Sequence, residues 1–400
     1  MRAVMLAGEP SGDALGAALI GGLRAEVGEG LEVSGVGGPE MARAGLESLF
    51  PMDRLTVMGI AEVLPRLPEL LSRIRETGDW VAETKPDVLI TIDSPDFCLR
   101  VARRARRLWP ELRTVHYVAP SVWAWRPGRA VKMARMIEHV LALLPFEPKL
   151  MEAAGMSSDF VGHPITSLAP PDRTRIRAFR SKAGLRADEP VLIVLPGSRR
   201  GEVRRVGPVF RDTVRILHRQ FRDIRPVIPM VAARASEVRD VFADAPGRPI
   251  FLDPAEFDLE EKLAAFATAD LALAASGTVT LELAAAGAPM IVAYNTNWLT
   301  GMIARRMVRL ETVTLVNLIT GRLAVPEFLL ERCRPGLIAA EAKRYLLDTD
   351  LADAQRAVSQ EAMRRLGRDG PDPGLLAARS VLAHLSRPQV RASIEARPST

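Results

Sequence analysis

The chain has 400 residues, which makes two domains a better expectation than one. Hydrophobic residues are 48% of the composition and charged residues 26%, as in globular proteins with sizeable cores. The net charge of +6 would suit a nucleic acid, an anionic membrane face or a phosphorylated ligand. Arginine greatly outnumbers lysine, so we give the charge little weight alone, and we expect no nucleic-acid partner.

The cysteines and histidines argue against the usual metal sites and disulfides. Cys98 and Cys333 match no metal or disulfide framework, as expected for reduced thiols in a cytoplasmic protein. The five histidines show no HxxxH or HExxH spacing, so we expect neither a metal nor another cofactor. No signal peptide is visible, and no stretch approaches the roughly 18 apolar residues of a membrane span. A membrane contact, if there is one, would be peripheral.

Short apolar runs alternate with amphipathic stretches along the chain, which is typical of βαβ units with parallel sheets. In the first half we expect strands within 3–8, 32–37, 87–94, 114–119, 139–145 and 159–162. Helices are expected within 13–27, 95–109, 129–137 and 147–154. In the second half the strands are expected within 191–197, 225–231, 249–253, 271–276 and 289–295, and the helices within 202–219, 236–243, 259–267, 278–287 and 298–309.

A segment rich in proline and charge, 165–189, is the expected domain boundary. From about residue 336 the pattern is helical only. The sequence therefore predicts an α/β protein of two Rossmann-like, doubly wound parallel-sheet domains, 1–168 and 169–345. C-terminal helices and a loosely ordered tail would follow in 346–400.

Ligands of such sheets bind at the carboxyl ends of the strands, where two segments of the first half carry polar residues. In GEPSGD (8–13), Gly8 and Gly12 permit a tight turn, and Ser11 or Asp13 can cap the following helix. Glu9 is unusual there, because a carboxylate repels phosphate and suits a sugar hydroxyl instead.

In IDSPDF (92–97), two carboxylates follow an apolar strand. One of them can cap the helix that starts at Pro95, and the other, for which we favour Asp96, could take a proton from an alcohol. Farther on, PSVWAWRPGR (120–129) brings Trp123 and Arg126 together. That segment is either a packed loop or a wall that grips an acceptor sugar, and the sequence does not separate the two.

The strand ends of the second half favour an anionic ligand. LPGSRRGEV (195–203) places Arg199 beside the start of a helix, where a guanidinium and free N–H groups can bind phosphate. In SGTVTLE (276–282), Ser276 to Thr278 allow close backbone approach, and Glu282 can accept hydrogen bonds from vicinal hydroxyls. Asn317 lies in an apolar run and needs partners from backbone or ligand.

Two further segments could contact a membrane or a metal-bound diphosphate. Residues 57–76 give an apolar face with nearby arginines, interrupted by Pro65 and Pro68. This face is either core-facing or membrane-facing, and we favour membrane contact. A DxD at 348–350 lies in the helical tail, so it predicts a helix N-cap and not a metal-bound diphosphate.

Taken together, these segments resemble the lipid-A-disaccharide synthases, a family of glycosyltransferases with the GT-B architecture. The resemblance runs from residue 2 to about 345, and the order and spacing of the motifs carry it. Pro10 replaces an alanine of some members, a mild departure. The motifs are GEPSGD (8–13), GVGGPEM (35–41), VMGIAEVLPRLPELL (57–71), IDSPDF (92–97), PSVWAWRPGR (120–129), LPGSRRGEV (195–203), SGTVTLE (276–282) and VNLITGR (316–322).

The resemblance implies an inverting transfer from UDP-2,3-diacylglucosamine to 2,3-diacylglucosamine 1-phosphate (lipid X), giving a β-1,6-linked disaccharide 1-phosphate and UDP. It also implies an acceptor in the N-terminal domain, a nucleotide in the C-terminal domain and final helices that return to the first domain. The partners would be both substrates and the anionic cytoplasmic face of the inner membrane, with a homodimer as one option.

The residue assignments follow from both lines of reasoning. We expect Asp96 as catalytic base, with Glu9 as second choice or orienting group. The donor would contact Arg199, Ser276, Gly277, Thr278, Glu282 and Asn317. The acceptor would contact Ser11, Gly12, Asp13, Trp123 and Arg126. The membrane would contact Val57, Met58, Ile60, Val63, Leu64 and Leu67. Two alternatives stay open: an enzyme like the UDP-N-acetylglucosamine 2-epimerases, and a non-catalytic nucleotide-sugar-binding protein.

Overall fold

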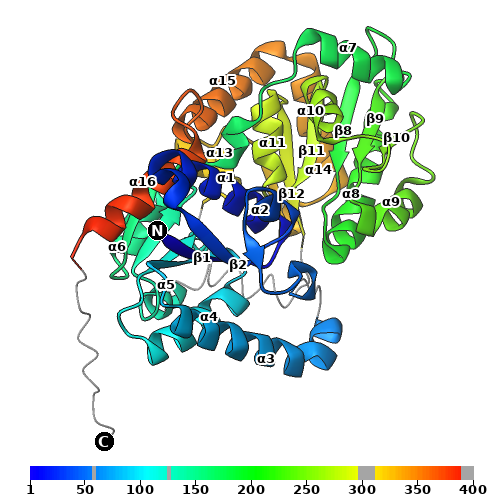
Figure 1. Cartoon of the computed structure of the whole chain (residues 1–400). Helices are drawn as coiled ribbons and strands as arrows, with labels where there is room; N and C mark the ends of the chain where they lie inside the picture. Colours follow the sequence, from blue (N-terminus) through cyan, green and yellow to red (C-terminus); the bar gives the residue numbers. More distant parts are fainter. Residues whose placement is uncertain (56–59, 124–127, 296–310, 389–400) are drawn as a thin grey trace, which may run out of the picture. The chain divides into compact units, whose positions relative to one another are not determined.

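Two α/β units, each built on a parallel sheet, form the described part of the chain (Figure 1). The structure, a computed structural model, describes residues 1–55, 60–123, 128–295 and 311–388, and side chains in these ranges except at 60–67. The first unit comprises 1–164 together with 370–388, and the second comprises 165–369. The region that we predicted as one C-terminal piece, 346–400, is therefore divided between the two units.

The first unit is built on a parallel sheet with the strand order β3-β2-β1-β4-β5-β6-β7. The β4 sequence VLITI is buried at every position, as expected for a parallel strand covered on both faces. The strands are β1 (Arg2–Ala7), β2 (Glu32–Val36), β3 (Glu47–Ser48), β4 (Val88–Ile92), β5 (Thr114–Tyr117), β6 (His139–Ala142) and β7 (Ser157–Phe160). The helices are α1 (Pro10–Val27), α2 (Pro39–Arg43), α3 (Ile60–Thr84), α4 (Pro95–Leu108), α5 (Gly128–Met133), α6 (Glu147–Glu152) and α16 (Pro373–Ser386).

Helix α16 packs against α1, far from it in sequence (Figure 1). The backbones approach so closely that a methyl group on Gly22 would collide with Gly374. At the other end of α16, the Arg113 guanidinium donates to the carbonyl of His384 at 2.6 Å. The Ser380 hydroxyl donates to the Asp159 carboxylate at 2.7 Å. These contacts make the last described helix an integral part of the first unit.

The second unit is built on a parallel sheet with the strand order β10-β9-β8-β11-β12-β13. Its strands are β8 (Val191–Leu195), β9 (Arg225–Pro229), β10 (Ile250–Leu252), β11 (Leu271–Ala275), β12 (Met290–Tyr294) and β13 (Glu327–Leu329). Its helices are α7 (Arg173–Lys182), α8 (Arg200–His218), α9 (Ala235–Phe242), α10 (Leu259–Ala267), α11 (Val279–Ala286), α13 (Leu315–Thr320), α14 (Pro335–Leu347) and α15 (Thr349–Arg365).

Both sheets have the doubly wound topology. In each, successive strands are added on one side of the first strand of the unit and then on its other side, so the strand order reverses next to that strand. In the first unit the reversal lies between β1 and β4, where Ala7 is in register with Ile92. In the second it lies between β8 and β11, where Leu195 is in register with Ala274. Ligands of doubly wound sheets bind at the carboxyl ends of the strands at such a reversal. The four turns that follow these strands carry most of the predicted site.

The predicted α/β fold with two parallel sheets is confirmed. The strands β3 and β13 were not predicted, because edge strands of two or three residues leave no periodic signal. Helix α7 lies inside the segment that we predicted as a boundary. The prolines at 65 and 68 were expected to interrupt regular helix, but α3 continues through both, so that interpretation is wrong. The predicted helix 298–309 lies outside the described residues.

Candidate active site

At the reversal of the first sheet, the turns carrying Glu9 and Asp96 lie side by side. A methyl group on Gly8 would come within 2.7 Å of the Ser94 hydroxyl, which shows how closely the two turns approach. Glu9 occupies the N-cap position of α1 with an exposed side chain that does not cap the helix. Asp96 lies in the first turn of α4 and is also exposed. The first unit therefore brings both predicted catalytic carboxylates to one edge of its sheet.

A cavity of about 520 Å³ lies beside this reversal, between the ends of β4 and β5 and the helices α4 and α5. Asp93 and Asp96 both line it, whereas Glu9 does not. The other lining residues are Pro95, Leu99, Arg100, Arg103, His116, Val118, Ala119, Pro120, Ser121, Arg129, Lys132, Met133 and Met136. The sequence assignments missed the basic members of this set. The spacing of 96, 100 and 103, which places them on one face of a helix, was the available signal.

The backbone is strained where it borders this cavity. Asp93 and Ser94 are consecutive non-glycine residues in the left-handed region, with φ of 47° and 41°. Val118 has φ of 80°, a severe outlier for a β-branched residue. Each such residue costs about 1–3 kcal/mol, and strain of this kind clusters at active sites and ligand clamps. The strain makes this cavity, rather than another hollow of the unit, the candidate acceptor site.

Burial shifts the pKa of two titratable groups in the cavity. It raises the pKa of Asp93 above the ordinary aspartate value, because the charged form is poorly solvated. It lowers the pKa of His116 to about 4, so this imidazole is neutral near pH 7. The His116 Nδ1 atom lies 2.8 Å from the Thr91 hydroxyl. A carboxylate with a raised pKa is better matched to proton abstraction near neutral pH than an ordinary one.

Asp13, predicted to contact the acceptor, is held by backbone amides of the first unit, and its contact with the acceptor stays a prediction. Its carboxylate accepts hydrogen bonds from the backbone amides of Gly38, Glu40 and Met41, at 2.9, 2.9 and 3.0 Å. The side chain is 2% exposed and caps the start of α2 across the turn. Gly12 is buried against Ile92, while Ser11 is exposed and stays a predicted acceptor residue.

The structure describes Trp123 but not Trp125 or Arg126 of the tryptophan segment. The Trp123 indole donates to the Glu147 carboxylate at 3.3 Å and packs edge-on against Phe146. Glu147 is buried, and burial raises its pKa to about 7. Trp123 is thus packed against residues of its own unit. A contact of Trp123 or Arg126 with the acceptor remains a prediction.

In the second unit, the predicted phosphate-binding turns follow the two strands that flank the reversal, β8 and β11. Gly197 has φ of 114°, and a methyl group there would strike Glu202. The Glu202 carboxylate accepts from the amides of Ser198 and Arg199 at 3.1 and 3.2 Å. The Arg199 guanidinium lies 3.3 Å from Glu202, yet its side chain is 83% exposed, so a ligand can reach it.

The β11–α11 turn holds the small residues predicted to approach the donor. Gly277 has φ of 153° and is exposed together with Thr278, while Ser276 is half-buried. Glu282 follows one turn into α11 and forms an ion pair of 2.5 Å with Lys262 of α10. That pair engages the Oε2 atom of Glu282.

Asn317, predicted to support the donor, is satisfied by its own unit. The side chain is 1% exposed. Its amide nitrogen donates to the Thr312 hydroxyl at 3.1 Å and to the Val325 carbonyl at 3.0 Å, and its oxygen accepts from the Val325 amide at 2.9 Å. Both donors and one acceptor position are used, by the Thr312 hydroxyl and the Val325 backbone, and a contact of Asn317 with the donor stays a prediction.

Two other predicted segments have simpler outcomes. The DxD at 348–350 is a helix N-cap as predicted, because the Asp348 carboxylate accepts from the Leu351 amide at 3.1 Å. Of the predicted membrane residues, Val57 and Met58 lie outside the described residues. Ile60, Val63, Leu64 and Leu67 belong to α3, where side chains are not described before residue 68. No helix among those described has both the length and the apolar content needed to cross a bilayer.

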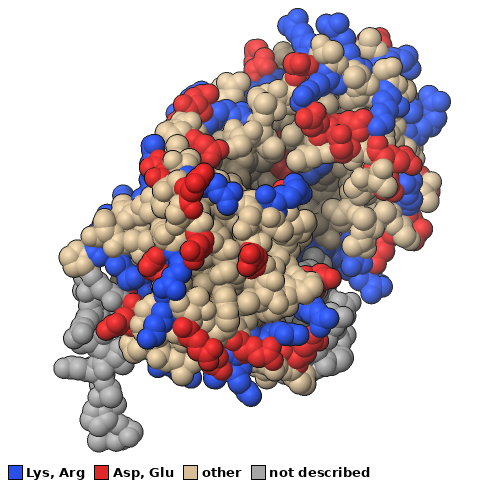
Figure 2. Space-filling model, viewed as in Figure 1, with Lys and Arg blue, Asp and Glu red and all other residues tan. Residues whose placement is uncertain are grey.

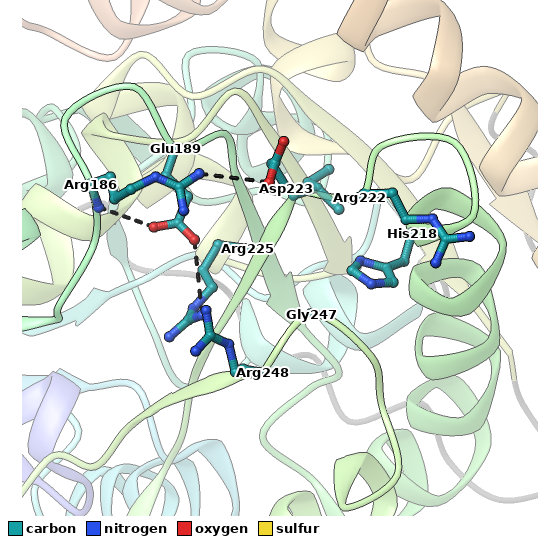
Figure 3. A pocket seen from close by; sticks show the side chains of 9 residues that line it. Arg186, Glu189, His218, Arg222, Asp223, Arg225, Gly247 and Arg248 are labelled. Carbon is teal, nitrogen blue, oxygen red and sulfur yellow. Dashed lines mark hydrogen bonds and ion pairs between the residues drawn. The ribbon is translucent and has the colours of Figure 1, made fainter.

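A second cavity, of about 260 Å³, lies in the second unit and is shown in Figure 3. Arg225 and Arg248 lie close together on one side of it, and Glu189 and Asp223 form ion pairs with its arginines (Figure 3). Glu189 precedes β8, and Arg225 is the first residue of β9, so this cavity is at the amino ends of the strands. Parallel sheets bind their ligands at the opposite edge. We therefore do not assign the donor to it.

Comparison with known proteins shows the family to which the chain belongs. Residues 3–371 match the family model described as lipid-A-disaccharide synthetase. The chain is 53% identical over 389 residues to a lipid-A-disaccharide synthase of Ruegeria pomeroyi, covering 96% of each chain. It is 44% identical over 380 residues to that of Rhodospirillum centenum, covering 94% of this chain and 93% of the relative.

Solved structures share the fold at low identity. The UDP-GlcNAc 2-epimerase from Neisseria meningitidis, bound to UDP-GlcNAc, has a TM-score of 0.63 and 10% identity, covering 96% of this chain and 99% of its own. A glycosyltransferase from Rickettsia africae has a TM-score of 0.57 and 11% identity, covering 96% and 97%. At such identities the epimerase likeness shows the fold alone. From the family match and the two curated relatives, the chain is a member of the lipid-A-disaccharide synthase family, the glycosyltransferases of lipid A biosynthesis.

Proposed function

We propose that the protein transfers 2,3-diacylglucosamine from its UDP derivative to 2,3-diacylglucosamine 1-phosphate with inversion. The acceptor hydroxyl oxygen attacks C1 of the donor, and its proton passes to a carboxylate. The bond between C1 and the diphosphate oxygen breaks, and UDP leaves with the electron pair. The products are a β-1,6-linked disaccharide 1-phosphate and UDP. An oxocarbenium-like transition state needs a base on one face of the sugar and charge stabilisation on the other.

The observation that carries the proposal is the strained, carboxylate-lined cavity beside the reversal of the first sheet. Asp96 is the proposed base, because it is accessible and lines the cavity next to the turn that carries Glu9. Asp93 lines the same cavity, and its raised pKa makes it the second candidate. Glu9, on the neighbouring turn, would orient the acceptor. A positioned base contributes about 10²–10⁴-fold to the rate.

The donor would lie at the reversal of the second sheet. Because β8 and β11 are adjacent and parallel, the turn of Arg199 and the turn of Ser276 to Thr278 can share one diphosphate. Arg199 would exchange its exposed contact with Glu202 for the phosphate oxygens. Glu282 has its Oε1 atom left for ribose hydroxyls while Oε2 is paired with Lys262.

We further propose peripheral attachment to the anionic cytoplasmic face of the inner membrane through the first half of α3. The substrates carry acyl chains, and the sequence of 60–67 is rich in large apolar residues. The second half of the helix anchors it to the unit, since Ile74 is buried and α3 packs on α4. Between the two halves, Leu71 is 42% exposed. Apolar insertion next to arginines is the pattern of interfacial helices.

The decisive assay mixes purified protein with both acylated substrates and follows UDP and disaccharide, with and without a chelator. We expect chelator-insensitive turnover that falls about 10²–10⁴-fold in Asp96→Ala, while Asp188→Ala, at an exposed carboxylate of the second unit, keeps the full rate. Full turnover by Asp96→Ala would show that another residue acts as the base. Conversion of UDP-N-acetylglucosamine to its manno epimer, without disaccharide formation, would replace the proposal with the epimerase alternative.

Membrane attachment is tested separately by sedimentation with vesicles containing anionic lipid. Leu71→Glu should weaken binding, whereas Leu347→Glu, at a leucine that is 64% exposed on the second unit, should not. Equal binding by both variants would contradict attachment through α3.

A further inference from the structure

Four basic side chains line the cavity that holds Asp93 and Asp96. Arg100 and Arg103 come from α4, and Arg129 and Lys132 come from α5 and its start. Because Asp96, Arg100 and Arg103 are spaced by four and three residues, α4 presents them on one face toward the cavity. The two carboxylates and four cations leave a net positive lining.

The cavity arginines differ from their neighbours on α4 in their partners. Arg104 makes a bidentate pair with Asp79, at 2.6 and 2.7 Å, and Arg106 pairs with Glu138 at 3.3 Å. Within the described ranges, Arg100, Arg103 and Lys132 form no ion pair or hydrogen bond through their side chains. Three like charges that face one cavity without internal partners repel one another, and a bound anion would relieve that repulsion. On the face seen in Figure 2, by contrast, acidic and basic side chains are interspersed.

The remaining lining is largely apolar, with Leu99, Val118, Met133 and Met136 among its members. The cavity is thus lined by cationic side chains, apolar side chains and two carboxylates. A nucleoside diphosphate would bring its diphosphate charge beside the carboxylates, and it has no acyl chain to place against the apolar side chains. A small amphipathic molecule with a phosphate group and a free hydroxyl uses all three features.

We infer that Arg100, Arg103 and Lys132 bind the phosphate monoester of the acceptor and thereby hold its hydroxyl near Asp96. This inference rests on the proposed function and adds the group that selects the acceptor. A phosphate monoester carries a charge close to −2 near pH 7, which matches the excess of cations over carboxylates. Binding at this remote group orients the nucleophile and raises the rate without touching the reacting atoms.

The test compares two acceptors with the intact enzyme: diacylglucosamine 1-phosphate and the same lipid lacking the phosphate. In Arg100→Gln and Arg103→Gln, KM for the phosphorylated acceptor should rise about tenfold each, as expected for one lost charge-assisted hydrogen bond. KM for the donor should stay unchanged. With the phosphate-free acceptor, wild type and variants should have equal, low kcat/KM. Arg107→Gln is the matched control, because this exposed arginine of α4 does not line the cavity.

The outcomes separate this inference from the proposed function. No disaccharide from the wild-type enzyme would refute the proposed function itself. Normal wild-type turnover with Arg100→Gln and Arg103→Gln behaving like Arg107→Gln would overturn the phosphate assignment alone. An equal loss with both acceptors would also overturn it, since the arginines would then shape the cavity rather than bind the phosphate.

Discussion

The reversal points of the two sheets hold their polar groups in different ways. In the first unit, Asp13 is buried under three backbone hydrogen bonds, and Asp93 is partly buried on a strained backbone. In the second unit, the Arg199 side chain is 83% exposed, and Glu282 is held by an ion pair between neighbouring helices. The first site is therefore preorganised by burial and strain, whereas the second holds exposed charges that a ligand can capture. Substitution of the buried groups of the first site should change stability, whereas substitution of the exposed groups of the second should change binding alone.

The largest effect on stability is expected from Asp13→Ala. Three amides at the start of α2, one buried and two partly buried, would lose their acceptor, at a cost of about 3 kcal/mol in the free energy of unfolding. Asp13→Asn should lose less, because one oxygen still accepts from Gly38 and Met41. The control Asp348→Ala removes an exposed helix cap and should cost about 1 kcal/mol. Urea unfolding measures the free energy of unfolding of all three variants. A loss in Asp13→Ala no larger than that in Asp348→Ala would contradict the stabilising role of Asp13.

Glu147, also in the first unit, should make stability depend on pH. Its pKa is raised from 4.5 to about 7 in the folded state, so protonation favours folding. The associated stability is fully present below pH 4.5 and is lost as pH rises through about 7, a change of about 3 kcal/mol. Glu147→Gln, which cannot ionise, should lack this part of the profile. Parallel pH profiles of unfolding for wild type and variant from pH 5 to 9 would contradict the prediction.

The second unit should respond in binding rather than stability. Arg199→Gln removes an exposed pair with Glu202, so unfolding should change by less than about 0.5 kcal/mol. UDP binding should weaken about tenfold, because a forked donor to the diphosphate is lost. Calorimetric titration with UDP measures the second quantity. Arg204→Gln, an exposed arginine of α8, is the control. Unchanged UDP affinity in Arg199→Gln would remove this residue from the donor site.

The smallest effect is expected from Asp93→Asn, which sharpens the comparison within the first unit. Because the pKa of Asp93 is raised in the folded state, its stabilising contribution is present below the ordinary aspartate pKa and lost as pH rises through the folded value. At neutral pH the neutral variant should be slightly more stable to unfolding than wild type, while tolerating the left-handed φ. If Asp93 is the base, the variant also loses turnover. Thermal unfolding at pH 7.5 and the disaccharide assay separate these two effects, and a lower melting temperature would contradict the first.

Much of the fold was predictable, because short apolar runs such as VLITI and VLIVL are typical of strands that a parallel sheet buries on both faces. The turns at the strand ends were predictable too, since glycine at 197 and 277 marks backbone that other residues adopt poorly. The lipid-A-disaccharide synthase family was recognisable from the order of those turns. Short edge strands were not predictable, because they lack periodicity.

The partners of individual polar side chains were decided by tertiary structure alone. Asp13 meets Gly38 and Asn317 meets Val325 only after the chain has folded, so a capping residue and a ligand-binding residue look identical in sequence. The cationic lining of the first cavity arises in the same way, because α4 and α5 follow the neighbouring strands β4 and β5 of the sheet. Local sequence determines which elements form and where they turn. Which charges end up buried, paired or left for a ligand depends on contacts between segments distant in the chain.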